Sequence, residues 1–545
     1  MKRFAVIILL FFITIPTFKL FSSRLITVAE ESNYSRTSTY NEVMTFLFSA
    51  QQQSDQIKII RFATSYEGRM LPLAVISSEG IKSARELAIS GKPAILIMAN
   101  IHAGEIEGKE AMMMFIQDVV EKKANLYLEN QVLLVLPIFN ADGNDKFGKN
   151  RDDNGPELAG VRYNGQRLDL NRDYLKMESP EVQGLVQLLE TWDPILVVDM
   201  HTTNGSYHRN PVTYSTGAHP NTDPALVDFM WKQMFPAVSQ ILKNAYGYDS
   251  IPYGNFVDNL DPSKGWTNDT ELARYGTNYI ALRNRFTILD ENYSHADYKT
   301  RVLSSYSFVK SILEFTRKNI KHMKELSQAA DMKTINSFCK DKFCLESKNE
   351  ILFDITVKSY VFEIVKIKPE EQDKFPPWIK DYYPRQTETF KDYTIPYFAQ
   401  PVPTKTISIP EAYIIGPNHP EVIEKIKKHG IIVERISKEF KTVVDVFKTE
   451  EISLAKQLYQ GHVTLTLKGS YGTEERTIPA NSYFISMKQP LARLIPVLLE
   501  PESVDSLAAW GFFNRELVEQ WFPRPNVYPV FRIFNITVPI ERYQE

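Results

Sequence analysis

Residues 94–101 read AILIMANI, a continuous apolar run of strand length. Such a run is typical of a strand that is buried on both faces of a sheet. Two similar runs follow it, Gln131–Ile138 (QVLLVLPI) and Ile195–Met200 (ILVVDM). Segments with helical spacing of their apolar residues lie between these runs, at Glu107–Lys123 and Val182–Trp192. Strands that alternate with helices predict an α/β domain, with a mostly parallel mixed sheet flanked by helices.

The α/β pattern covers residues 35–325, from a predicted helix at Tyr40–Gln51 to a long predicted helix at Tyr298–Leu326. The character of the sequence then changes. Pro369–Pro403 is rich in proline and tyrosine, and we expect it to be a connector. Residues 335–545 as a whole predict a smaller C-terminal accessory region, either α/β or β-rich.

The overall composition is that of an ordinary globular protein. The chain has 545 residues, of which 43% are hydrophobic and 24% are charged. Lys and Arg number 63 against 66 Asp and Glu, for a formal net charge of −3. Because the chain has no general basic excess to hold a polyphosphate backbone, we expect no nucleic-acid partner.

The N-terminus has the pattern of a secretory signal peptide. Met1-Lys2-Arg3 precedes an apolar run, Phe4–Phe18, that contains no charge. A retained membrane anchor is the alternative, but this run is shorter than the roughly 20 residues that span a bilayer. We expect residues 1–25 to be the signal, with Thr27-Val28-Ala29 a small-residue candidate for cleavage. The mature protein is then exported, periplasmic or secreted, with no membrane association.

The only two cysteines are Cys339 and Cys344, in the segment CKDKFC. An oxidising compartment would allow them to form a local disulfide, which we expect here. A metal site is the less favoured alternative, because no histidine lies close to them in the sequence.

Candidate ligands follow three of the apolar strands. His102-Ala103-Gly104-Glu105 comes directly after AILIMANI, His201 directly after ILVVDM, and Glu291 directly after Phe286–Asp290. Because the carboxyl ends of parallel strands meet at one edge of a sheet, these side chains should lie close together. Two histidines and a carboxylate are a common catalytic zinc set that leaves a fourth position for water. Each motif is weak alone, since a histidine three positions before an acid is expected about once by chance in this composition.

A polar cluster, LDLNRDY at residues 168–174, adds a second function to the predicted site. Arg172 can bind a carboxylate through two parallel N–H donors, and Asn171 can add another. The alternative for this pair is an ordinary ion pair in a loop. Together the motifs predict a zinc site beside a carboxylate receptor.

The order of the motifs resembles that of the M14 zinc carboxypeptidases, the carboxypeptidase A-like metallopeptidases. The motifs are HAGE, NADG, LDLNRDY, DMH and LDEN, and the resemblance covers about residues 35–325. The segment 489–513 also looks like the C-terminal extension of exported bacterial M14-like proteins. The resemblance implies a zinc-dependent metallocarboxypeptidase that hydrolyses a peptide bond next to a free C-terminal carboxylate.

The resemblance also implies roles for individual residues. One Zn²⁺ would be bound by the three strand-end ligands, the substrate carboxylate would be held by the Asn-Arg pair, and one acid would be the catalytic base. An arginine would polarise the scissile carbonyl, with Arg151 and Arg162 as candidates, and Tyr275 is the candidate for the substrate-capping tyrosine. The residues in these implied roles are His102, Glu105 and His201 for the metal, Asn171, Arg172 and Arg151 for the substrate, and Glu291 for catalysis.

Two other functions remain open at this stage. The same site could serve a zinc amidase or esterase that acts on a cell-wall peptide or another non-standard substrate. The chain could also be a non-catalytic M14-like binding protein. The complete set of ligands, base and Asn-Arg pair argues against the second of these, and the first depends on pocket residues that the sequence does not place.

Overall fold

The computed structural model describes residues 24–150, 154–268, 270–375, 379–517, 527–536 and 541–544. Most of the predicted signal segment and Arg151 lie outside the described residues. The centre of the molecule is an eight-stranded sheet in the order β1-β2-β4-β3-β7-β12-β8-β9. Its central neighbours β4, β3, β7 and β12 run parallel, whereas β1 and β2 pair antiparallel at one edge. The predicted α/β fold with a mixed, mostly parallel sheet is confirmed.

The central strands are those expected from the sequence. They are β3 (Ala94–Ala99), β4 (Val132–Leu136), β7 (Leu196–Thr203) and β12 (Phe286–Tyr293). The outer strands are β1 (Ile57–Thr64), β2 (Met70–Ile76), β8 (Val212–Ser215) and β9 (Ser250–Pro252).

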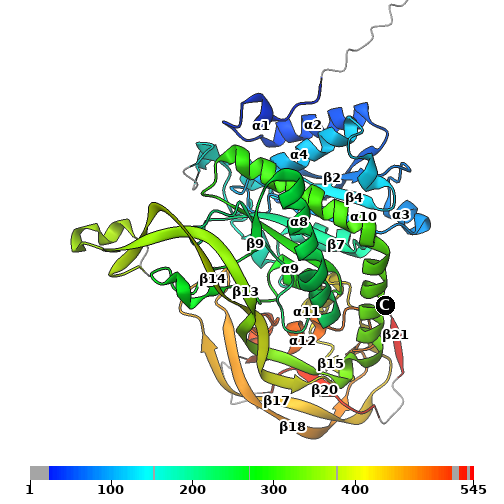
Figure 1. The fold of residues 1–545 in the computed structure, drawn as a ribbon. Coiled ribbons are helices and arrows are strands. Elements are labelled where there is room, and N and C mark those ends of the chain that lie inside the picture. Colours follow the sequence, from blue (N-terminus) through cyan, green and yellow to red (C-terminus); the bar gives the residue numbers. More distant parts are fainter. Residues whose placement is uncertain are drawn as a thin grey trace, which may run out of the picture.

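Successive residues of β3 pack into two different cores, as the two-residue period of a strand requires. Ile95 and Ile97 pack with α2 (Tyr40–Gln53), α4 (Glu107–Val120), α8 (Phe235–Tyr246) and α10 (Tyr298–Ser337). Leu96 and Met98 pack on the opposite face with α6 (Pro180–Trp192). Helices therefore cover both faces of the sheet, which explains why its strands are apolar throughout (Figure 1).

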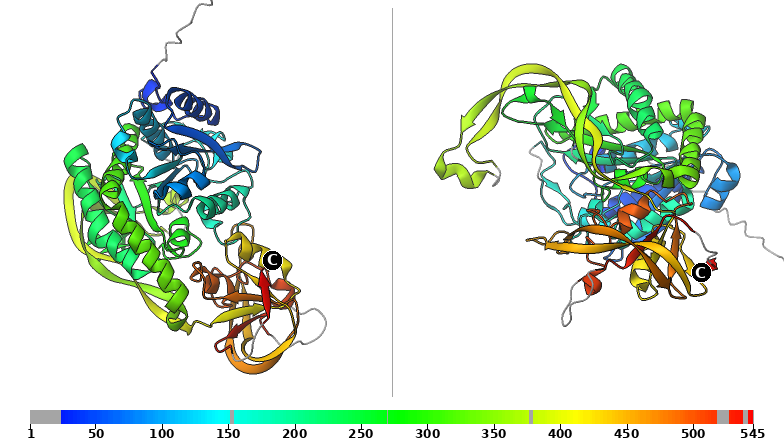
Figure 2. Two further views of the ribbon diagram at one scale, coloured as in Figure 1. Left: turned by 90° about the vertical axis from the view of Figure 1, so that its right-hand side faces the viewer. Right: turned by 90° about the horizontal axis from the view of Figure 1, so that it is seen from below.

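A long antiparallel hairpin follows α10. Its strands are β13 (Lys342–Lys366) and β14 (Tyr382–Ser408), and they pair along nearly their whole length. The central sheet and the helices that cover it are called the first domain below. The short strands β10 (Asn255–Phe256) and β11 (Trp266–Thr267) join the hairpin to this first domain in one four-stranded sheet. Figures 1 and 2 show the far end of this hairpin projecting beyond the rest of the molecule.

The C-terminal part is a seven-stranded antiparallel sheet with helices, as the β-rich alternative predicted. Its order is β18-β17-β20-β15-β19-β16-β21. The strands are β15 (Ala412–Ile415), β16 (Glu434–Ile436), β17 (Phe440–Leu454), β18 (Leu465–Ile478), β19 (Tyr483–Ser486), β20 (Val530–Ile533) and β21 (Arg542–Gln544). The helices α11 (Pro420–Lys428) and α12 (Leu494–Leu499) share a continuous apolar core with α6, so this sheet packs on the α6 face of the central sheet (Figure 2).

Two predictions from the sequence are wrong. Much of Pro369–Pro403 is strand β14 and not a connector. Its prolines are tolerated because, among the described residues, β14 pairs on its second side only at Tyr397 and Phe398, with β11, so few backbone N–H groups are needed there. The predicted disulfide is also absent: Cys339 and Cys344 are free, and the Cys344 thiol donates to the Glu346 carbonyl at 3.1 Å.

Among the described residues, no helix combines the length and the apolar character needed to cross a membrane.

Candidate metal centre

Three buried side chains converge at the carboxyl ends of β3 and β7. His102 follows β3, Glu105 lies just before α4, and His201 is on β7. One ligand atom of each lies within 4.8 Å of the others. His102 Nδ1 is 3.0 Å from Glu105 Oε1, and His201 Nδ1 is 2.9 Å from Glu105 Oε2. Ligand atoms of a tetrahedral zinc site lie about 3.3 Å apart at the usual bond lengths, and the two histidine–carboxylate distances are close to this spacing.

A glycine allows α4 to approach the sheet closely enough to bring Glu105 to the histidines. A side chain at Gly108 would place its Cβ 2.8 Å from Met200 Cβ and 3.1 Å from Ala99 Cβ. The first turn of α4 therefore rests directly on β3 and β7. The backbone N–H of Thr202 then donates to Glu105 Oε2 at 3.1 Å and fixes the carboxylate.

The outer ring nitrogens of both histidines face carboxylates. His102 Nε2 is 2.9 Å from Asp169 Oδ1 in a hydrogen bond. His201 Nε2 is 3.0 Å from Asp199 Oδ2, although this contact is not aligned as a hydrogen bond. Carboxylates in this position keep the outer nitrogen protonated and leave the lone pair of the inner nitrogen for a metal. The donor set, two Nδ1 atoms and a carboxylate, fits zinc.

The electrostatics of the triad also suit a cation. Burial alone would raise the pKa of Glu105, but the two neighbouring histidines hold it well below its usual value. Burial would lower the pKa of His201, but Asp199 and Glu105 raise it well above its usual value. The buried carboxylates therefore concentrate negative charge around the point where the histidine nitrogens meet.

Glu291 and Asp290 occupy opposite faces of β12. In the parallel register Glu291 lies beside His201, and Asp290 lies beside Met200, which packs against α4. Asp290 is fully buried, whereas Glu291 is partly exposed on the side of the sheet where His201 lies. The strand thus brings Glu291, and not Asp290, to the edge that carries the triad.

The predicted carboxylate receptor lies next to the triad. Asn171 Oδ1 accepts a hydrogen bond from the backbone N–H of Gly276 at 2.8 Å. The Arg172 guanidinium donates to the Asn171 carbonyl at 2.8 Å and lies 4.3 Å from the centre of the Tyr275 ring. Burial raises the pKa of Tyr275, and the nearby Arg172 charge partly offsets this.

One of the two candidate arginines is placed at the site. Arg162 Nε donates to Asp169 Oδ2 at 2.8 Å, and its Nη1 is 3.5 Å from Glu105 Oε1. The charge of Glu291 also acts on Arg162. The other candidate, Arg151, falls among the residues that the structure leaves undescribed.

Four residues at the site were not predicted. Asp169 belongs to the LDLNRDY motif, which assigns it no role of its own. Asp199 lies two positions before His201 on the same strand face, and this spacing is a usable signal. Tyr253 lies near Glu291 and Glu105, and burial together with these charges raises its pKa. Gln460, in the C-terminal part, accepts a hydrogen bond from the backbone N–H of Asp169 at 2.8 Å. No local pattern marks Tyr253 or Gln460, because both reach the site only through tertiary packing.

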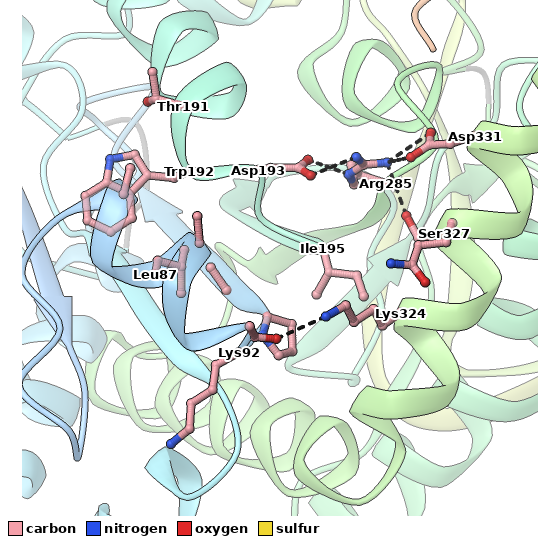
Figure 3. A pocket seen from close by; sticks show the side chains of 16 residues that line it. Leu87, Lys92, Thr191, Trp192, Asp193, Ile195, Arg285, Lys324, Ser327 and Asp331 are labelled. Carbon is pink, nitrogen blue, oxygen red and sulfur yellow. Dashed lines mark hydrogen bonds and ion pairs between the residues drawn. The ribbon is translucent and has the colours of Figure 1, made fainter. Parts of the chain in front are cut away.

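A cavity of about 400 Å³ lies at the other edge of the sheet, where β3, β7 and β12 begin. Its lining includes Arg285, which is bound by Asp193 at 2.7 Å and by Asp331 at 3.0 Å (Figure 3). Both acids neutralise this cation, whereas the ammonium of Lys324, which also lines the cavity, donates to the Gly91 carbonyl at 3.0 Å. The cavity is remote from the strand ends that carry the triad.

A mixed α/β sheet with a His-Glu-His triad and an Asn-Arg pair at one edge defines a metallopeptidase type of site. Comparison with known proteins indicates which type of metallopeptidase this site resembles. Residues 44–224 match the model of the M14 peptidase family, described as zinc carboxypeptidase. This part of the chain is similar to the zinc carboxypeptidases, and together with the relatives below the match supports a zinc metallopeptidase.

Relatives and solved structures were also found. The chain is 24% identical over 487 residues to carboxypeptidase 2 of Trichophyton equinum, covering 86% of this chain and 81% of that protein. Carboxypeptidase 2 of Trichophyton rubrum is 24% identical over 486 residues, with the same coverage. A metallo-carboxypeptidase structure from Burkholderia cenocepacia is 14% identical, with a TM-score of 0.39, and the match covers 52% of this chain and 70% of that one.

Proposed function

We propose that this protein is an exported metallocarboxypeptidase that binds one zinc ion through His102, Glu105 and His201. It hydrolyses the peptide bond next to a free C-terminal carboxylate. The observation that carries the proposal is the double role of Asp169. Its Oδ1 bonds His102 Nε2 at 2.9 Å and accepts from the Asn171 backbone N–H at 3.0 Å. One carboxylate therefore ties the metal triad to the carboxylate receptor.

This connection supports cleavage at the end of a peptide. Arg172 and Asn171 hold the terminal carboxylate through charge-assisted hydrogen bonds. A peptide held there presents its last peptide bond to the triad, and an interior peptide bond has no such anchor. The relatives named carboxypeptidase 2 support the same activity.

The chain supplies the remaining groups for hydrolysis. Bound zinc supplies Lewis-acid activation of water and of the scissile carbonyl. Glu291, beside His201, accepts the proton of the attacking water and then passes it to the leaving amine. Arg162 places N–H donors beside Glu105, where they stabilise negative charge that develops on the carbonyl oxygen.

A pair of matched peptides tests the proposal. One ends in a free carboxylate, and the other has the same sequence with a C-terminal amide. We expect zinc-loaded protein to release the last residue of the first peptide and to cleave the second at least about 100-fold more slowly, since the charge-assisted bonds to the carboxylate are lost. Removal of zinc by a chelator should abolish the activity, and added zinc should restore it. Equal cleavage of the amide would favour an amidase that does not read the carboxylate, and murein fragments would then be the next substrates to test.

A further inference from the structure

A loop from the C-terminal sheet reaches the metal centre. It connects β17 to β18, and its end, the tip loop Tyr459–His462, is a tight two-residue turn. The N–H of Tyr459 donates to the His462 carbonyl at 2.8 Å, and the N–H of His462 donates to the Tyr459 carbonyl at 3.0 Å. The turn places the side chain of Gln460 against the first domain.

Gln460 adopts a backbone conformation that is unusual for its residue type. Its φ is +51°, and that of the following Gly461 is +83°. A two-residue turn with both values positive favours Asn-Gly or Asp-Gly, because most other side chains are strained at positive φ. A strained residue at such a position persists when its side chain has a use elsewhere.

The Gln460 side chain bonds to the residue that joins the two halves of the site. Gln460 Oε1 accepts from the backbone N–H of Asp169 at 2.8 Å. Asp169 is buried, and its carboxylate in turn contacts the metal ligand His102, the Asn171 backbone and Arg162. Without Gln460 this buried N–H would lose its acceptor, and the loop that carries Asp169 would lose one of its constraints.

The tip loop is itself held in place by contacts with both parts of the molecule. His462 Nε2 is 2.8 Å from Glu178 Oε1. Tyr459 stacks on Trp510, and the Arg274 guanidinium lies 5.3 Å and 5.0 Å from the centres of these two rings. Tertiary packing therefore fixes the position of Gln460, which does not depend on the conformation of the loop alone.

The same contacts extend to the carboxylate receptor. Arg274 is 2.6 Å from Asp505, a buried acid of the C-terminal part. Arg274 directly precedes Tyr275, whose ring lies against the Arg172 guanidinium. The C-terminal part therefore borders the site at two points, Asp169 and Tyr275.

We propose that Gln460 is a positioning residue of the metal centre, which acts through Asp169 on His102. The C-terminal region is then a part of the active site and not only an accessory. This inference rests on the proposed function, because it assigns Gln460 a role in the same zinc site.

Three substitutions of Gln460 in the full-length protein separate positioning from folding. Gln460→Met keeps the length of the side chain but removes the acceptor, and Gln460→Glu keeps an acceptor oxygen. Gln460→Gly removes the acceptor and also relieves the positive φ. Leu458→Ala is the matched control, since Leu458 is exposed on the same loop. Zinc affinity by chelator competition, kcat/KM on a peptide with a free carboxylate, and Tm are measured for each variant.

We expect Gln460→Met to weaken zinc binding about 10-fold, the low end of the range for outer partners of metal ligands, with Gln460→Glu close to the wild type. Gln460→Gly should lose zinc affinity like Gln460→Met but lose less Tm, because relief of the positive φ offsets part of the cost of the lost acceptor. Unchanged zinc affinity and kcat/KM in Gln460→Met would overturn the inference, as would losses that simply follow Tm. A wild-type protein that binds no zinc would instead overturn the proposed function, so the two failures are distinguishable.

Discussion

Two neighbouring acids on β12 point to opposite faces of the sheet, and only Glu291 faces the edge with the triad. We predict that Glu291→Gln keeps zinc and still binds substrate but loses about 10²- to 10⁴-fold in kcat, the usual contribution of a general base. The amide has almost the same shape but cannot accept a proton. Because proton transfer matters mainly in the transition state, the loss should appear in kcat and not in KM. Steady-state kinetics together with zinc analysis by mass spectrometry check this. Full activity in both Glu291→Gln and Asp290→Asn would remove general-base catalysis from this strand, whereas a loss in Asp290→Asn alone would assign the base to Asp290.

Asp290 is the matched control for Glu291, and it also gives a prediction about pH. It is fully buried, and among the described residues no hydrogen-bond partner is found for either of its oxygens. Burial, with the nearby Glu291 and Glu107 charges, raises the pKa of Asp290 well above its ordinary value of 3.8. Between these two pKa values the folded state binds more protons than the unfolded state, so the free energy of unfolding falls as the pH rises.

Asp290→Asn removes this ionisation. The Tm of the variant should therefore exceed that of the wild type by an amount that grows as the pH rises above about 4. Its activity should be largely retained. Thermal melts from pH 4 to pH 8 measure the gain. A Tm difference that is the same at every pH would contradict the prediction.

The topology of a parallel sheet brings residues that follow apolar strands to one edge. On this basis the sequence places His102, His201 and Glu291 at a shared edge, and their roles in the site stay predictions. The sequence cannot place Gln460, which is 291 positions from Asp169 and meets it only after the C-terminal sheet has packed. Asp199, the carboxylate behind His201, can be placed in part from the sequence. The two-residue period of β7 puts it on the same strand face as His201.

At the scale of single elements, the contact between α4 and the sheet controls the position of Glu105. We predict that Gly108→Ala destabilises the fold by about 1–3 kcal/mol, the usual cost of an inserted methyl group in a packed interface. The added Cβ would meet Met200 Cβ at 2.8 Å, so α4 must move outward and take Glu105 with it. Chemical denaturation and zinc affinity should both report a loss. Gly416→Ala is the control, because no atom lies within 4 Å of an added Cβ there, and it should change neither quantity.

The elements that the sequence predicts correctly are those with a strong local pattern, such as the apolar run that forms β3. Strand β14 was missed because its prolines locally favour a connector, whereas the energy that fixes it comes from pairing with β13, which begins 40 positions earlier in the chain. The sequence predicts a bridge between Cys339 and Cys344 from their spacing and from an oxidising compartment. In the fold, Cys339 lies just after α10, and Cys344 is held within β13 by its bond to the Glu346 carbonyl.

At the scale of the whole chain, we predict that exported protein lacks the N-terminal segment and carries two free thiols. Thr27 caps helix α1 (Val28–Glu31) with its side chain, and Ala29 is buried, so cleavage is expected before Thr27 and not within the small-residue candidate. Intact-mass analysis of exported protein, after alkylation in denaturant without reductant, should show loss of about the first 25 residues, the length of an ordinary signal, and two labels. A mass that includes Met1 would contradict the loss of the N-terminal segment. A chain that takes up no label would contradict the two free thiols.

The continuous core on the α6 face joins the two parts of the molecule into one unfolding unit. Leu185 of α6 packs in the same apolar cluster as Ile426 of α11 and Ile495 of α12. The buried Arg493 adds a polar link, with Nη2 2.9 Å from Asp223 Oδ2 and Nη1 donating to the Asn221 carbonyl at 2.8 Å. We therefore predict one cooperative thermal transition for the full chain, with a calorimetric enthalpy about equal to the van't Hoff enthalpy.

Arg493→Met tests whether this link belongs to a single unit. It leaves the buried Asp223 with the Ala225 N–H and the more distant ammonium of Lys333, at 3.3 Å, and breaking a buried pair in this way costs about 3–5 kcal/mol. Because the two parts unfold together, the whole transition should move to lower temperature without splitting, and zinc should be lost at the same temperature as the secondary structure. Calorimetry and circular dichroism on the zinc-loaded protein measure both changes. If the variant showed two separate transitions, with the metal centre surviving the loss of the C-terminal sheet, the two parts would be independent domains, and the contact of Gln460 with Asp169 would not be needed to keep the site formed.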